Sequence, residues 1–161
     1  MYDTFELMGS SMSAVHNAKS FEPRRSRSID QFSADGVCFA AQTLDGATVV
    51  SATGELDASN IHHLRDFARS CLTRGPTLVL DLSHLDFLGA QGIRSLLEIA
   101  DECERSGIEW ALVPSHPVSR LLRICDKHAR LPAVSSIDEA VERFSAPARM
   151  HGLLQLVTKS R

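Results

Sequence analysis

The stretch TLVLDL at residues 77–82 decides the fold class of this 161-residue chain. Its apolar residues follow one another almost without interruption, which is typical of a strand buried on both faces of a sheet. A second short run of this kind, EWALV at residues 109–113, follows an amphipathic stretch with helical period. Helices that alternate with continuous apolar strands predict an α/β sheet in which at least part of the strands are parallel.

The segments around these two runs complete the expected order of elements. Residues 37–43 and 47–53 predict an antiparallel hairpin, because Asp45-Gly46 between them favours a tight turn. Right-handed crossovers would place the first two long helices against the same sheet. Apolar residues at helical spacing predict helices over residues 59–73, 91–106, 117–125 and 136–144.

Composition divides the chain into one domain and two tails. Residues 1–34 hold sparse apolar residues and repeated serines, so they cannot bury enough surface to offset the entropy of ordering. They predict a flexible Ser/Arg-containing tail. The domain is expected over residues 35–145, followed by a C-terminal tail over residues 146–161.

Charge and hydropathy exclude several classes of partner. A formal net charge of -3 and a sequence pI near 6.1 leave no electrostatic footprint for nucleic acid or for an anionic membrane. No run approaches about 18 consecutive apolar residues, so membrane insertion is not expected. The first residues lack the basic start and apolar stretch of a signal peptide. We therefore expect a cytoplasmic protein that binds neither nucleic acid nor membrane.

No motif for catalysis, cofactor binding or metal binding stands out. Phosphate-binding loops, dinucleotide fingerprints and hydrolase or zinc-protease motifs are missing from the sequence. Cys125 and His128 have the spacing of half a zinc site, but no second half follows. Asp81 and Asp86 bracket a predicted loop after the buried strand, where they would organise the loop or cap the next helix. We expect no enzymatic activity, no cofactor and no metal.

Several short motifs, each weak alone, stand in an order that resembles one known family. Gly54-Glu55-Leu56-Asp57 precedes an amphipathic helix, LVLDLSHLDFL follows at residues 78–88, and Leu112-Val113-Pro114-Ser115 precedes a further helix. This order, over residues 37–144, resembles the STAS family of bacterial anti-sigma-factor antagonists, or anti-anti-sigma factors. The resemblance implies the STAS fold, an α/β structure whose mixed central sheet carries helices mainly on one side.

The resemblance also implies a function in transcription regulation, such as a stress response. In this family an unphosphorylated antagonist binds an anti-sigma factor, typically a serine-kinase-type ATPase, and so releases a sigma factor. The kinase then phosphorylates a serine at the N-terminus of the second helix, in a motif of the type Asp-Ser-Ser-Gly. A dianionic phosphate suits a helix N-terminus but disrupts a complementary partner surface.

This chain departs from the family at that motif. Gly89-Ala90-Gln91-Gly92 stands there, so Ala90 occupies the phosphoacceptor position without a hydroxyl, and Gly89 replaces the preceding acid. Gly89 can still cap the helix. We therefore expect a chain that binds its partner but lacks the usual off-switch.

By the same resemblance, the partner-binding surface comprises the loop from Asp86 to Gly89 and the exposed face of the helix that follows. Its residues are Asp86, Gly89, Ala90, Gln91, Arg94, Ser95 and Glu98.

Other switches and functions stay open at this point. The basic cluster around Ser26 and Ser28 suits a Ser/Thr kinase. Cys71 and Cys103 would form a redox switch if their Cα atoms lay within about 7 Å. The alternative functions are a STAS subunit of a membrane-transport assembly and a small-ligand sensor that uses the hairpin and residues 83–89. A homodimer is also open.

Overall fold

A three-stranded antiparallel meander opens the sheet. In this computed structural model, which describes residues 27–146, β1 (Arg27–Ala34), β2 (Val37–Leu44) and β3 (Ala47–Leu56) pair in chain order. Asp35-Gly36 and Asp45-Gly46 connect them, and all four residues have positive φ angles between 49° and 85°. This is the geometry of two-residue hairpin turns, whose twist matches that of the flanking strands.

Two parallel strands complete the five-stranded sheet. β4 (Thr77–Leu88) lies beside β3, and β5 (Glu109–Pro114) lies beside β4, which gives the spatial order β1-β2-β3-β4-β5. Parallel neighbours need a crossover connection. The helices α1 (Ile61–Cys71), which continues into a short 3-10 turn, and α2 (Ala90–Arg105) supply the two crossovers. The predicted mixed α/β sheet is confirmed.

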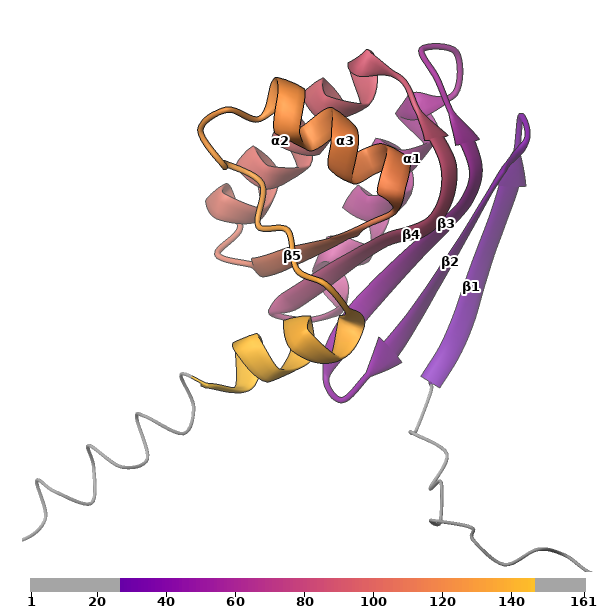
Figure 1. Cartoon of the computed structure of the whole chain (residues 1–161). Helices are drawn as coiled ribbons and strands as arrows, with labels where there is room; N and C mark the ends of the chain where they lie inside the picture. Colours follow the sequence, from indigo (N-terminus) through magenta and orange to yellow (C-terminus); the bar gives the residue numbers. More distant parts are fainter. Residues whose placement is uncertain (1–26, 147–161) are drawn as a thin grey trace, which may run out of the picture.

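Helices cover the two faces of the sheet unequally (Figure 1). α1, α2 and α3 (His116–Cys125) pack over the larger core, to which β4 contributes the fully buried Leu80. The neighbouring Val79 points to the other face, into a smaller core beneath a last helix over residues 137–146. Within residues 27–146, no helix combines the length and apolar character needed to cross a bilayer. The helices thus lie mainly on one side of the sheet, as expected.

The strand β1 corrects the expected boundary of the N-terminal tail. The sequence predicts a tail over residues 1–34, but residues 27–34 form β1 and pair with β2, so that Phe32 lies opposite Phe39. An edge strand needs few apolar residues, because only part of it is buried, and its periodicity is weak. The dipeptide Asp35-Gly36 could have indicated this strand, since the same dipeptide at Asp45-Gly46 predicts a hairpin turn. Residues 1–26 and 147–161 lie outside the described residues.

The strand β4 extends further than the sequence indicates. The sequence predicts a loop over residues 83–89, whereas strand continues to Leu88. β4 keeps pairing with β3 through two irregularities of register, so that Leu82, Leu85 and Leu88 are all buried. A spacing of three residues breaks the two-residue alternation of a regular strand. That is why the pattern did not reveal this half of β4.

Candidate functional site

The carboxyl ends of β3 and β4 bring the starts of α1 and α2 together. The Gly89 amide, just after β4, donates a hydrogen bond of 2.8 Å to the carbonyl oxygen of Leu56, the last residue of β3. A Cβ atom on Gly89 would lie 3.5 Å from the Cα atom of Asp57. The two strand ends therefore fix the α2 start directly against the loop that leads into α1.

The first turn of α2 is bare of side-chain caps. Gly89 takes the N-cap position with an extended backbone (φ -68°, ψ 161°), and no side chain hydrogen-bonds to the helix start. Ala90 is the first helical residue and is exposed, as is Gln91. Gly92 is buried and packs on Leu88, since a Cβ atom there would lie only 2.2 Å from the Leu88 Cδ1 atom. Gly89 is confirmed as the cap, and Ala90 occupies the start of the helix.

An exposed patch surrounds this helix start, and we call it the α2-start surface. Its members are Asp86, Phe87, Ala90, Gln91 and Arg94, all of them exposed. Phe87 is an aromatic ring with 47% of its surface exposed. The predicted partner-binding loop from Asp86 to Gly89 contains Phe87, but sequence reasoning did not single out its ring as exposed. The register irregularities of β4 are what leave it outside.

Two residues predicted for this surface lie elsewhere. Ser95 is only 7% exposed, because it falls on the buried stripe of α2 together with Gly92 and Ile99. Glu98 is exposed but faces α1, where its Oε2 atom lies 3.1 Å from the Nη1 atom of Arg65. This contact with Glu98 is the main cause that raises the pKa of Arg65. The expected exposure is therefore wrong for Ser95, and the Glu98 side chain joins α2 to α1.

The β3–α1 loop is held by Asn60, which sequence reasoning also missed. The Asn60 side chain is 3% exposed and accepts a 2.9 Å hydrogen bond from the Asp57 amide. Its Nδ2 atom donates to the carbonyl oxygens of Asp35 and Glu55 at 3.0 and 2.9 Å. The Asp57 carboxylate accepts from the amide and hydroxyl of Ser59. Both hydrogen bonds lower the pKa of Asp57, and the bond from the Ser59 hydroxyl has the larger effect.

The cysteines proposed for redox switching are buried and free. Cys71 and Cys103 are 1% and 0% exposed, and neither forms a disulfide in the structure. Burial raises the pKa of the Cys103 thiol to about 11 and raises that of Cys71 as well. Since the thiolate is the reactive form, this environment disfavours oxidation at either position.

Only one of the two serines proposed for phosphorylation lies within the described residues. Ser26 is outside the described residues. Ser28 falls in β1, within the irregular stretch of pairing between Arg27 and Asp30. A kinase that modified Ser28 would therefore act on the first residues of an edge strand.

Comparison with known proteins identifies a matching family and several relatives. The sequence model of the STAS domain matches residues 39–140. Osmosensory protein A of Mycobacterium tuberculosis is 31% identical over 120 residues, which cover 71% of this chain and 76% of that protein. Anti-sigma-F factor antagonist RsfA of the same species is 32% identical over 101 residues, or 60% of this chain and 79% of RsfA.

A solved structure agrees with this assignment. The crystal structure of an anti-sigma factor antagonist from Mycobacterium paratuberculosis has a TM-score of 0.61 to this chain at 24% identity. The match covers 70% of this chain and 97% of that one, and at this identity it shows a shared fold. The fold, the order of motifs and the family match over well more than half of the chain lead to one conclusion: this chain belongs to the STAS domain family.

Proposed function

We propose that this chain is an anti-sigma-factor antagonist that binds an anti-sigma factor in the cytoplasm and thereby releases a sigma factor. Relatives named as antagonists of this kind support the role. The partner is proposed to be a serine-kinase-type ATPase. Binding rather than catalysis is proposed because the chain belongs to the STAS domain family and a relative is named as an antagonist of an anti-sigma factor.

The observation that carries the proposal is the composition of the α2-start surface. The ring of Phe87 is exposed and lies beside Gly89, where a Cβ atom would lie 3.7 Å from its Cε1 atom, and Asp86, Gln91 and Arg94 of the same surface are polar and exposed. Protein interfaces commonly combine an aromatic anchor with a polar rim that can exclude water around it. The small side chain of Ala90 and the glycine before it allow a partner to approach the backbone closely. These features fit a protein-binding surface.

The α2-start surface lacks the hydroxyl whose phosphorylation would release the antagonist from its partner. Ala90 has no hydroxyl, and Ser95 is the only hydroxyl residue between residues 86 and 95. Ser95 is 7% exposed, so a kinase bound at the α2 start cannot reach its Oγ atom without unfolding the helix. We therefore propose that this antagonist stays competent to bind while the kinase is active. Phosphorylation at Ser26 or Ser28 is the proposed alternative switch.

The decisive experiment places a charge at the helix start. Ala90→Glu puts a carboxylate into the proposed interface, and Ala90→Gln is the matched control of equal size without charge. Burying an uncompensated charge costs several kcal/mol, so titration calorimetry should show affinity for the anti-sigma factor lowered by orders of magnitude for Glu only. Folding should tolerate Glu, because an acid in the first turn suits the helix dipole. Tight binding by Ala90→Glu would remove the α2 start from the contact surface.

A second measurement addresses the missing off-switch. The full chain is incubated with ATP and its kinase-type partner, and phosphopeptides are then identified by mass spectrometry. We expect no phosphate on residues 86–95 and an undiminished complex. Phosphate on Ser95 accompanied by release would contradict the proposal.

A further inference from the structure

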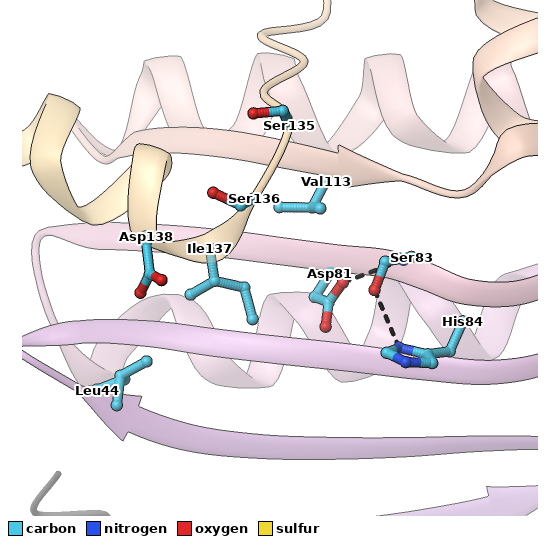
Figure 2. Close-up of a pocket in the computed structure, with 9 residues that line it drawn as sticks. All are labelled: Leu44, Asp81, Ser83, His84, Val113, Ser135, Ser136, Ile137 and Asp138. Carbon is cyan, nitrogen blue, oxygen red and sulfur yellow. Dashed lines mark hydrogen bonds between the residues drawn. The ribbon is translucent and has the colours of Figure 1, made fainter. Parts of the chain in front are cut away.

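A cavity of about 370 Å³ lies on the face of the sheet opposite α1, α2 and α3 (Figure 2). It opens beside the start of the last helix, where that helix leaves the second half of β4 uncovered. Leu44, Val113 and Ile137 provide an apolar lining, and Asp81 and Ser83 of β4 contribute polar atoms. A volume of this size, mostly apolar with a few convergent polar groups, is typical of small-molecule sites of about 300 Å³ and above.

The Asp81 carboxylate is the unusual group in this cavity. Asp81 is 6% exposed, yet its hydrogen-bond donors are the Ser83 amide at 3.0 Å and the Ser51 hydroxyl at 3.3 Å, which are both neutral. In the part of the chain that the structure describes, no lysine, arginine or histidine forms an ion pair with it. Carboxylates are almost never buried to this degree without a charged partner. A carboxylate has about four acceptor sites, so two remain for a ligand.

The rest of the lining favours a cation over an anion. No lysine or arginine lines the cavity, and the one histidine in its lining, His84, contacts the Ser83 Oγ atom through its Nδ1 atom at 2.9 Å. The start of the last helix would attract an anion, but the side chains of Ser136 and Glu139 already cap part of it. The Ser136 hydroxyl accepts from the Glu139 amide at 3.1 Å, and the Glu139 carboxylate accepts from the Ser135 amide at 2.7 Å.

We propose that this cavity binds a small organic cation, namely an alkylammonium ion. Its charged group hydrogen-bonds to the Asp81 carboxylate, and its hydrocarbon chain lies on Leu44, Val113 and Ile137. At about 30 Å³ for each water in the liquid, the cavity has room for roughly a dozen heavy atoms. A chain of four to six carbons would fit. The cavity shares no lining residue with the α2-start surface, so the proposal does not rest on the proposed function.

The test is an NMR titration of the full chain with n-butylammonium, with 1-butanol as the neutral probe of matched shape. The variant Asp81→Asn removes the charge and keeps an oxygen that can accept from the Ser83 amide. Asp86→Asn is the matched control, because Asp86 lies on the same strand but outside the cavity. We expect saturable shifts of the Ser83 and His84 amides in wild type and in Asp86→Asn. Affinity should fall at least about tenfold in Asp81→Asn, since a hydrogen bond to a charged group contributes about 1.5–3 kcal/mol.

A second variant keeps the test decisive if Asp81→Asn fails to fold. Ile137→Lys retains Asp81 and tethers an ammonium group at the cavity, so it should abolish butylammonium binding by competition. The proposal is overturned if wild type shows no saturable shift, if 1-butanol binds as tightly as butylammonium, or if a folded Asp81→Asn or Ile137→Lys binds like wild type.

Discussion

Replacing Gly92 with alanine sets two opposing effects of similar size against each other at the start of α2. Alanine is favoured over glycine in a helix by about 1 kcal/mol. Its Cβ atom, however, would lie 2.2 Å from the Cδ1 atom and 2.5 Å from the Cγ atom of Leu88. Leu88 is 5% exposed and cannot turn into solvent without losing its burial. Overpacking of this kind costs about 1–3 kcal/mol, so we expect a net loss of about 1 kcal/mol in the free energy of unfolding.

The same substitution should change sign once Leu88 is shortened. Leu88→Ala removes the atoms that meet the new Cβ, at its own cost of about 2–5 kcal/mol. In that background Gly92→Ala should stabilise the protein by up to about 1 kcal/mol, because only the helix preference remains. The expected coupling between the two positions is therefore about 2 kcal/mol, within the range for residues in contact.

Urea denaturation of the four proteins, with equal m-values, measures this cycle. Gln91→Ala serves as the control, because Gln91 is exposed and its replacement should change stability by less than about 0.5 kcal/mol. If Gly92→Ala stabilises both backgrounds to the same extent, the close contact with Leu88 does not govern this helix start, and the reasoning fails.

Three further predictions follow from single positions. Gly54→Ala should lower the free energy of unfolding by roughly 2–4 kcal/mol in urea denaturation. The φ angle of Gly54 is +103°, and a Cβ atom there would lie 2.3 Å from a carbonyl oxygen of the β1–β2 turn. A variant as stable as wild type would contradict this prediction. Asn60→Ala should cost roughly 2–4 kcal/mol by loss of three hydrogen bonds of a buried side chain, and a loss below about 1 kcal/mol would show that water replaces them. With a thiol reagent at pH 8, the exposed Cys38 and Cys125 should react well before Cys103, since burial raises the pKa of Cys103 to about 11. Equal reaction rates for all thiols would show that Cys103 is not protected by burial.

Residue patterns in the sequence predicted much of the fold, and the parts that they missed have physical explanations. The buried strands β4 and β5 were predictable because a strand covered on both faces needs a continuous apolar run. The hairpin of β2 and β3 was predictable because Asp45-Gly46 suits positive φ angles at both turn positions. The second half of β4 was not, since its register shifts are set by pairing with β3 and leave no regular period.

The start of the helix at the candidate site was predicted correctly, whereas several contacts around it were not. The motif located the start of α2 correctly, since Gly89 ends β4 and caps the helix. Ser95 was assigned to the exposed face by the resemblance to the family, although helical period groups it with Gly92 and Ile99 on the buried stripe. The role of Asn60 could not be read from spacing, because one of its hydrogen bonds crosses to Asp35, which is 25 residues away in the sequence.

The bare first turn of α2 also explains why charge, rather than size, should decide partner binding at Ala90. Neither an acidic residue in the first turn nor a side-chain cap balances the partial positive charge of this helix start. If the partner binds at the α2-start surface, a carboxylate of the partner can supply the missing acceptor. The side chain of Ala90→Glu would compete for the same amides and repel that carboxylate, whereas Ala90→Gln has an oxygen that can accept from the amides but no charge to repel the carboxylate. Added salt should weaken the wild-type complex more than the Ala90→Glu complex, because only the wild-type contact gains from this attraction.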